Sequence, residues 1–175
     1  MRTFVILFAA TANLTLLDAV VKELAVARLK GAGAVEVVKG FFNLAYVENR
    51  GCAWGMLQNH AVALAVVGVL AMALIAWQRR RLFDPLALPF KPKANAFIAL
   101  AAESLMYAGI LGNLIDRFYR GCVVDMFDFH IASSHFPCFN LADSYLTISV
   151  VLLLTAIFKR QSITPGLDKS PRKAV

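Results

Sequence analysis

Apolar residues along this chain are gathered into four long runs, which are separated by segments rich in polar residues. The runs cover about residues 3–21, 60–77, 94–115 and 141–158. A helix rises ~1.5 Å per residue, so runs of roughly this length can span the ~30 Å hydrocarbon core of a bilayer. The pattern predicts an all-α integral membrane protein with four transmembrane helices, which form a single domain over residues 1–160.

The overall composition strengthens the prediction of a membrane protein. Hydrophobic residues make up 59% of the chain, whereas soluble domains contain about 45–50%. The first run follows Arg2 and is similar to a signal peptide, but its apolar character continues to Val21, which predicts an uncleaved first helix. The net charge of +7 comes without a basic face that carries interleaved aromatic residues, so we expect no nucleic-acid partner.

The basic residues predict an orientation in the membrane. Segment 78–93 and the tail after the fourth run each hold five Lys or Arg residues, and Arg2 precedes the first run. Because short cytoplasmic segments carry the excess of Lys and Arg, both termini and segment 78–93 are expected in the cytoplasm. Loops 22–59 and 116–140 are then expected at the outer face. The polar tail 161–175 is expected to be cytoplasmic and disordered.

The outer loop 22–59 contains a pattern of its own. β-branched and aromatic residues alternate in part with polar residues along it, and the turn signal Asn49-Arg50-Gly51 follows. Such a segment, bounded by turn residues, is typical of strands. We therefore expect a small extracytoplasmic region rich in β-structure beside the four helices.

Ionisable residues at the expected outer ends of the helices are the first candidates for chemistry. Asp18 and Lys22 lie four residues apart, and Asn113 and Asp116 lie three apart, so each pair shares a helix face. Charged groups inside a membrane are costly and indicate function by default. Structural ion pairs remain the alternative, namely Asp18 with Lys22 and Asp116 with Arg117 or Arg120.

The fourth run begins with a helix start signal. Asn140 suits the N-cap, and Asp143 falls at the third helical position, where an acid faces the positive end of the helix. A capping role alone is one interpretation of Asp143. The other is a catalytic role, because Asp143 is expected at the same membrane depth as Asp116, Asp125 and Asp128.

A pair of neighbouring carboxylates would provide both an acid and a base. Two carboxylates held close together cannot both ionise readily, so one keeps its proton. The ionised member can take a proton from water while the protonated member donates to a carbonyl oxygen, as in aspartic proteases. The residues alone leave open which two of the acids Asp116, Asp125, Asp128 and Asp143 form such a pair.

Five short motifs, taken in order, resemble those of lipoprotein signal peptidase, the signal peptidase II family. They read DAVVK from Asp18, NRGCAWG from Asn49, GNLIDR from Gly112, GCVVD from Gly121 and FNLAD from Phe139. The resemblance covers about residues 18–158. It implies a membrane endopeptidase that removes signal peptides from diacylglyceryl-modified prolipoproteins, on the amino side of the lipidated cysteine.

The resemblance also implies roles for individual residues. The catalytic aspartates map onto Asp125 and Asp143. Because Asp143 is expected near a helix N-terminus, which favours its ionised form, we expect Asp125 to hold the shared proton. The supporting positions are Asn113, Asp116, Arg117 and Asn140 around the site, Asn49 and Gly51 in the outer loop over the substrate groove, and Asp18 and Lys22 on the first helix. Asp128 and His130 match no catalytic position.

The implied location is the bacterial inner membrane, with the active site at its outer face. The expected partners are diacylglyceryl prolipoproteins and membrane lipid, and we expect a monomer. No cofactor or metal is expected, because water is the nucleophile. Two alternatives stay open: a Mg²⁺-dependent membrane phosphotransferase of the CDP-alcohol type, for which DRFYRGCVVDMFD offers suitably spaced acids, and a non-catalytic polytopic membrane protein. Whether Cys52, Cys122 or Cys138 form disulfides is also left open.

Overall fold

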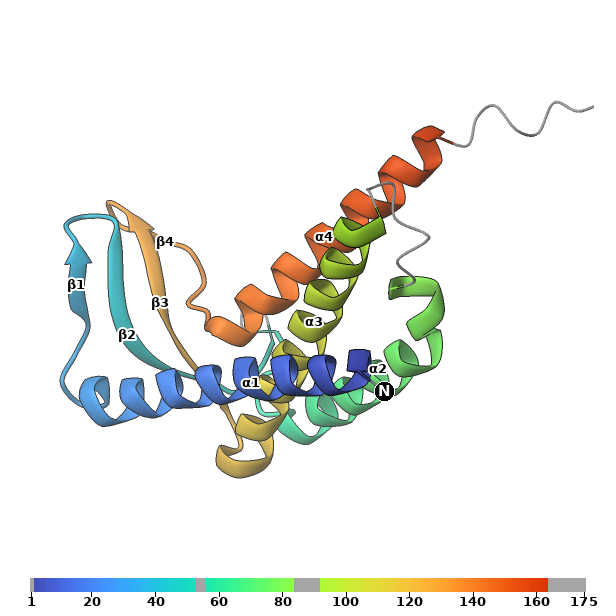
Figure 1. Ribbon diagram of the computed structural model, residues 1–175. Helices are drawn as coiled ribbons and strands as arrows, with labels where there is room; N and C mark the ends of the chain where they lie inside the picture. The colour runs from blue at the N-terminus through green and yellow to red at the C-terminus, as the bar shows by residue number, and fades with distance from the viewer. Residues whose placement is uncertain (1, 53–55, 84–91, 164–175) are drawn as a thin grey trace, which may run out of the picture.

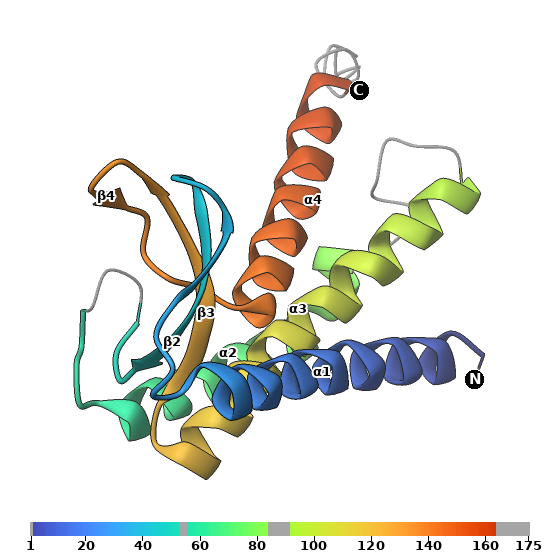
Figure 2. The same cartoon turned by 90° about the vertical axis from the view of Figure 1, so that its left-hand side faces the viewer.

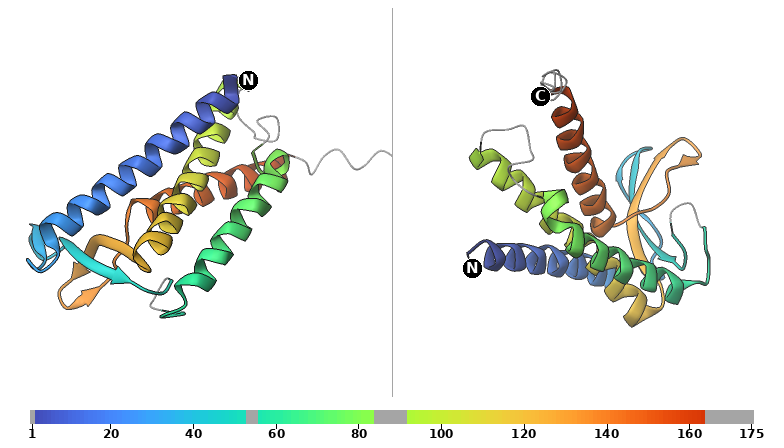
Figure 3. Two further views of the ribbon diagram at one scale, coloured as in Figure 1. Left: turned by 90° about the horizontal axis from the view of Figure 1, so that it is seen from below. Right: turned by 90° about the vertical axis from the view of Figure 1, so that its right-hand side faces the viewer.

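The chain folds into a group of helices with a small sheet beside them. The computed structural model describes residues 2–52, 56–83 and 92–163. The elements in this part of the chain are α1 (Arg2–Leu29), β1 (Val35–Val38), β2 (Phe42–Asn49), α2 (Ala61–Phe83), α3 (Pro92–Arg120), β3 (Val123–Ile131), β4 (Ser134–His135) and α4 (Leu141–Ile163). Figure 1 shows the sheet to the left of α2, α3 and α4, with the C-terminal part of α1 running below it, and Figures 2 and 3 show this arrangement from other sides.

Within the described part of the chain, three helices are long and apolar enough to cross a membrane. They are Arg2–Leu29, Ala61–Phe83 and the Ala96–Arg120 portion of α3, with mean hydropathies of 2.0, 2.3 and 1.5. In α4 the apolar stretch identified is the shorter segment Leu141–Thr155. The prediction of a helical membrane protein with a small sheet is therefore confirmed, whereas the fourth span stays a prediction.

The helices extend beyond the predicted bounds. α1 continues to Leu29 rather than ending near residue 21, because its last turns contain mainly good helix formers such as Lys, Glu, Leu, Ala and Arg. It is followed by Gly31, whose positive φ of 80° leaves the helical conformation. The second, third and fourth helices likewise end at residues 83, 120 and 163. Of the predicted tail, residues 164–175 lie outside the described part of the chain.

α3 is the central helix and packs against α1, α2 and α4. Two glycines permit the closest of these contacts, since a Cβ at Gly109 would lie 2.6 Å from the carbonyl oxygen of Ala142. A Cβ at Gly112 would lie 2.5 Å from an Asp18 carboxylate oxygen. These glycines therefore bring α1 and α4 close to the same turn of α3.

The sheet is antiparallel, with the order β1-β2-β3-β4. Strand β3 lies in the segment predicted to be a loop, and its alternation of Phe127, Phe129 and Ile131 with polar residues was the signal that could have identified it. Val124 and Met126 of β3 are buried against the last turns of α1, which run below the sheet in Figure 1. This packing fixes the strand that carries Asp125 to the helices.

Candidate active site

Asp125 lies on β3, and its side chain is nearly inaccessible, with 1% of its surface exposed. Two amide groups donate to it. Asn49 on the neighbouring strand β2 donates from Nδ2 to Oδ2 at 3.0 Å, and Asn140 donates from Nδ2 to Oδ1 at 2.6 Å. The carboxyl group is therefore held by one residue of the sheet and by one residue at the start of α4.

Asp143 lies in the first turn of α4 and takes part in its cap. Its backbone N–H donates to Asn140 Oδ1 at 3.0 Å, and the Asn140 N–H donates back to Asp143 Oδ2 at 3.3 Å. This reciprocal arrangement is a capping box. The other oxygen of Asp143, Oδ1, accepts from Asn113 Nδ2 at 2.7 Å. The predicted cap is present, and it leaves Asp143 partly exposed to a cavity.

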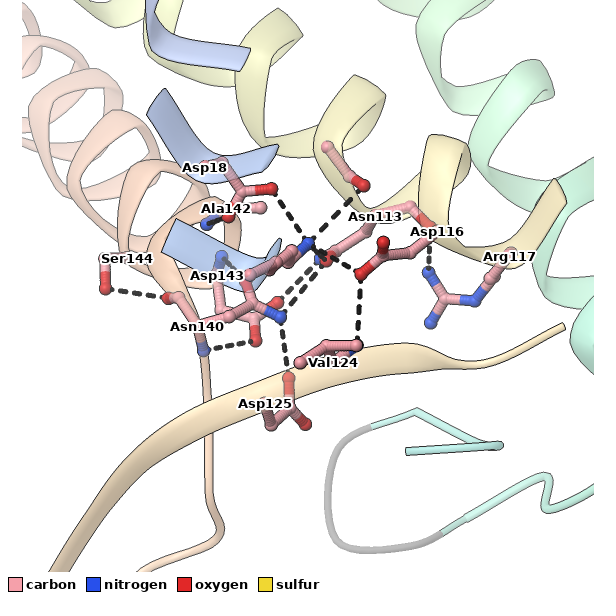
Figure 4. A network of polar contacts seen from close by, with 12 residues as sticks. Asp18, Asn113, Asp116, Arg117, Val124, Asp125, Asn140, Ala142, Asp143 and Ser144 are labelled. Atoms are coloured by element: carbon pink, nitrogen blue, oxygen red, sulfur yellow. Dashed lines mark hydrogen bonds and ion pairs between the residues drawn. The ribbon is translucent and has the colours of Figure 1, made fainter. Parts of the chain in front are cut away.

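Asn113 and Asn140 join the two carboxylates into one network. Asn140 Nδ2 also donates to Asn113 Oδ1 at 3.2 Å, so the two amides form a bridge between Asp125 and Asp143. Figure 4 shows this bridge between the strand that carries Asp125 and the start of α4. These contacts determine which side of each amide donates and which accepts. The two amides therefore fix the positions of the two carboxylates relative to each other.

A buried ammonium group supports the bridge from the side of α1. Lys22 Nζ lies 2.8 Å from Asp18 Oδ2 and 3.1 Å from Asp116 Oδ2, and it donates to Asn113 Oδ1 at 3.2 Å. Its side chain is 1% exposed. Burial of an isolated charge costs several kcal/mol, so this lysine depends on its two acidic partners. The predicted ion pair of Asp18 with Lys22 is therefore present, and it is part of the site.

Asp18 and Asp116 also hold the backbone next to the two candidate catalytic residues. Asp18 Oδ1 accepts from the N–H of Ala142 at 2.9 Å, and Asp116 Oδ2 accepts from the N–H of Val124 at 3.0 Å. Ala142 directly precedes Asp143, and Val124 directly precedes Asp125. Asp18 thus joins α4 to α1 next to Asp143, and Asp116 joins β3 to α3 next to Asp125.

The predicted arginine positions have different partners. Arg120, rather than Arg117, pairs with Asp116 at 2.9 Å, and it also pairs with Glu23. Arg117 instead donates to the carbonyl oxygens of Gly51 at 3.1 Å and Asn113 at 3.2 Å. It therefore connects α3 to the loop after β2. Gly51 in turn donates its N–H to Asn49 Oδ1 at 3.0 Å, which orients the amide that contacts Asp125.

Burial and a neighbouring charge change the acidity of Asp125. Burial raises the pKa of its carboxyl group, the charge of Asp143 raises it further, and the result is a pKa of about 7 in place of 3.8. The hydrogen bonds from Asn49 and Asn140 oppose this rise without cancelling it. A substantial fraction of Asp125 is therefore protonated at neutral pH.

Asp125 and Asp143 line one cavity of about 910 Å³. Side chains from three helices make much of its wall apolar; among them are Leu64, Ile110, Leu114, Leu146 and Ile148, with Gly68 beside them. Such a wall suits an apolar ligand, while the carboxylates mark one polar edge. Cys52 and Cys138 line the same cavity, and both are free thiols, as is Cys122.

Every residue that the sequence assigned to the site belongs to this network, whereas Asp128 does not. On the extended strand β3, Asp128 contacts Asn43 at 3.1 Å and His135 at 2.7 Å. This agrees with the absence of a catalytic position for Asp128 among the motifs, while the expected common membrane depth of the four acids stays a prediction. Sequence reasoning missed the buried Glu103 of α3, which pairs with Arg79 of α2 away from the site. A single acid within an apolar run was the available signal.

Comparisons with known proteins agree with this geometry. The family described as Signal peptidase (SPase) II matches residues 10–159. The lipoprotein signal peptidase of Halothermothrix orenii is 33% identical over 148 residues, which cover 85% of this chain and 92% of the relative. That of Streptococcus pneumoniae is 33% identical over 145 residues, which cover 83% and 87% of the two chains.

Two solved structures share the fold. Both are described as bacterial membrane enzymes solved by the in meso method. The first has a TM-score of 0.73 and 28% identity and covers 97% of this chain and 94% of its own; the second has a TM-score of 0.69 and 30% identity and covers 87% and 92%. The chain is thus a bacterial membrane protein that belongs to the signal peptidase II family, the aspartic endopeptidases that remove signal peptides from lipoproteins.

Proposed function

We propose that Asp125 and Asp143 are the catalytic pair of this peptidase and that they activate water for cleavage before the lipidated cysteine of a prolipoprotein. The amide bridge carries the proposal, because Asn140 donates to Asp125 while its partner Asn113 donates to Asp143. It holds carboxylates from two different elements at the edge of one cavity. Two acids held in this way provide a base and an acid together.

The proposed first step uses Asp143 as the base and Asp125 as the acid. Water attacks the scissile carbonyl carbon and gives a proton to Asp143, while Asp125 gives its proton to the carbonyl oxygen. The product is a neutral gem-diol, with Asp143 protonated and Asp125 ionised. The raised pKa of Asp125, which burial and the Asp143 charge cause, supports this assignment. Asp143 accepts hydrogen bonds from Asn113 Nδ2 and from the Asn140 N–H, a set of contacts that suits a base.

The second step returns the pair to its starting state. Asp143 donates its proton to the amide nitrogen as the carbon–nitrogen bond breaks, and Asp125 takes a proton from the gem-diol as the carbonyl re-forms. The products are the released signal peptide with a new carboxyl terminus and the lipoprotein with a free amine on its cysteine. Every proton in this cycle moves between substrate, water and the two carboxyl groups. The proposed reaction therefore uses water as the nucleophile.

The cavity supports a lipid-modified substrate. Its apolar wall is formed by α2, α3 and α4, which are elements that face the hydrocarbon region in a membrane protein. Acyl chains on the substrate cysteine can lie against this wall while the scissile bond reaches the carboxylates. The Asn49–Gly51 turn, held by Arg117, covers the opposite side. We therefore infer that membrane lipid borders the site during catalysis.

The proposal includes an orientation. α4 has 23 residues, which correspond to ~34 Å of helix, so we infer that it is the fourth membrane span. The excess of Lys and Arg in segment 78–93 and after Thr155 supports cytoplasmic termini and a site at the outer face of the inner membrane. One chain supplies the whole carboxylate network, which supports activity as a monomer. Labelling of single cysteines from each side of vesicles tests this orientation.

Two substitutions test the catalytic pair. Asp125→Asn and Asp143→Asn should each lower the rate of cleavage of a diacylglyceryl prolipoprotein about 1,000-fold or more, because either change removes one half of the acid–base pair. Each replacement keeps the side-chain shape, and purified yield with the thermal midpoint in detergent reports folding. Glu36→Gln removes a charge from the exposed strand β1 and is the matched control. Substantial cleavage by either aspartate variant, if it is well folded, would contradict the proposed pair.

A further inference from the structure

A second cavity adjoins the active site on the side of the sheet. It has a volume of about 560 Å³. Its lining consists of Ala45, Val47, Asp128, His135, Phe136, Pro137 and Cys138. The members Val47, Phe136, Pro137 and Cys138 also line the active-site cavity, so the two cavities are contiguous. None of the residues that line the second cavity belongs to a helix.

Asp128 is the acid of this second cavity, and its carboxylate is held in place. Asn43 Nδ2 donates to Oδ2 at 3.1 Å, and His135 Nδ1 donates to Oδ1 at 2.7 Å. The His135 ring stacks on His130, with their centroids 4.9 Å apart. The Asp128 side chain nevertheless remains 15% exposed. Each of its oxygens keeps a lone pair for a further donor.

The carboxylate of Asp128 is ionised at neutral pH. Burial alone would raise its pKa, but the hydrogen bonds from His135 and Asn43 outweigh burial and hold the pKa below the ordinary value. The other contributions to the lining are mainly apolar, from Ala45, Val47 and the loop that follows β4. The cavity therefore combines an apolar wall with one fixed negative group.

The distance from the catalytic pair identifies the part of the substrate that can reach this cavity. Asp125 and Asp128 are three residues apart on β3, which corresponds to ~10 Å along a strand. An extended substrate bound beside the strand covers the same distance in about three residues. The acyl chains lie against the helical wall in the proposed function, and the apolar segment of a signal peptide suits the same region. We therefore assign the segment that extends over the sheet to the residues that follow the lipidated cysteine.

We propose that the cavity at Asp128 and His135 is a specificity subsite for the second or third residue after the lipidated cysteine, and that it prefers Lys or Arg there. The aliphatic part of such a side chain packs on the apolar wall, and its cationic head donates to Asp128. The assignment rests on the proposed catalytic role of Asp125, because that role fixes where the scissile bond lies. A Glu side chain at the same position places two carboxylates together and is disfavoured.

A set of synthetic substrates tests the subsite. Diacylglyceryl-cysteine peptides carry Lys or Glu at one of the first four positions after the cysteine and are otherwise identical, and kcat/KM is measured in detergent micelles. We expect a preference for Lys of roughly tenfold at the second or third position and of at most about twofold at the first and fourth. Absence of a Lys preference at both the second and third positions overturns the proposal.

Variants of the enzyme separate a direct contact from a general effect of charge. Asp128→Asn should reduce the preference to about twofold, and Asp128→Lys should reverse it in favour of Glu. Reversal is a gain that loss of folding cannot produce. Glu36→Gln removes an acid from the exposed strand β1 and should keep the full preference. If Asp128→Lys retains the preference for Lys, the subsite lies elsewhere.

The same substrates distinguish failure of the subsite from failure of the catalytic pair. Asp125→Asn should cleave none of the peptides, whichever residue they carry. Cleavage by Asp125→Asn would contradict the catalytic pair on which the position of the subsite rests. If Asp125→Asn is inactive, as expected, but Asp128→Asn keeps an unchanged preference for Lys, the subsite alone is contradicted.

Discussion

Asp18 on α1 accepts a hydrogen bond from the backbone N–H of Ala142 on α4 at 2.9 Å, although the two residues are 124 positions apart in the chain. Ala142 directly precedes Asp143, and Asp18 also pairs with the buried Lys22. One carboxylate therefore both fixes the start of α4 and balances the charge that supports the amide bridge. We therefore expect Asp18 to act by positioning Asp143 rather than by contacting the scissile bond.

Replacement of Asp18 should impair catalysis through geometry. In Asp18→Asn the amide can still accept from Ala142, but Lys22 loses a full negative partner, and the start of α4 shifts as the network rearranges. We expect kcat to fall roughly 100-fold with a much smaller change in KM, because displacement of a catalytic group by about 1 Å has an effect of that size. Steady-state kinetics on a diacylglyceryl peptide measure both constants.

The conservative variant is the control for this prediction. Asp18→Glu keeps the charge and should recover part of kcat. If Asp18→Asn raised KM and left kcat unchanged, Asp18 would have a role in substrate binding instead. Equal activity of Asp18→Asn and the wild type would show that the negative charge of Asp18 is not needed to position Asp143.

The pH dependence of cleavage should report the protonation of Asp125. Its pKa is raised to about 7 by burial and by the charge of Asp143. The proposed acid role requires the protonated form, which is present below this value and is lost as the pH rises through it. We therefore expect kcat/KM to fall about tenfold per pH unit above about 7. A pH–rate profile measured with a substrate that has no titratable side chain provides the test.

The surroundings of Asp125 offer a control for the assignment. Asn49→Ala removes a hydrogen bond that lowers the pKa of Asp125. The alkaline limb should therefore move to higher pH in this variant, even if the rate itself falls. A limb that stays at the same pH in Asn49→Ala would assign the titration to a different group.

Local patterns in the sequence predicted the helices and several of the site contacts. Apolar runs predicted where helices lie, and the spacing of Asp18 and Lys22 predicted their pairing, because both depend on neighbours along one helix. The capping box of Asn140 and Asp143 was likewise a local signal. The candidate catalytic pair came from the expected common membrane depth and from the resemblance of the motifs.

Contacts between distant segments could not be predicted in the same way. Asn49 and Asp125 are 76 positions apart, and their contact depends on the pairing of β2 with β3. The conformation of the segment that forms β3 is left open by the sequence, although the alternation of Phe127 and Phe129 with polar residues is typical of a strand. Extended backbone also explains why Asp128 lies away from the pair, since residues three apart on a strand are separated by ~10 Å.

Close packing of α3 on α4 should make Gly109 intolerant of a larger residue. A Cβ at this position would lie 2.6 Å from the carbonyl oxygen of Ala142 and equally close to a Leu146 side-chain carbon. Backbone must therefore move in Gly109→Ala, and the start of α4 would move with it. We expect destabilisation of about 1–3 kcal/mol and a loss of kcat. Thermal midpoints in detergent and steady-state kinetics provide the two measurements.

Gly68 on α2 is the matched control for this substitution. A Cβ there would meet the side chain of Leu114 at 2.9 Å, and that side chain can rotate away. Gly68→Ala should therefore be milder in both stability and kcat. The same loss in both variants would show that overpacking, rather than displacement of Ala142, is responsible.

The ion pair of Glu103 with Arg79 should contribute to stability without contributing to catalysis. Glu103 is buried, Arg79 Nη2 donates to it at 2.9 Å, and neither residue lines the active-site cavity. Glu103→Gln leaves Arg79 without its charged partner and should cost about 1.5–3 kcal/mol of stability. At a temperature well below the midpoint, kcat/KM of the folded variant should equal that of the wild type. An unchanged thermal midpoint with a lowered kcat would instead connect this pair to the site through α3, the helix that carries both Glu103 and Asn113.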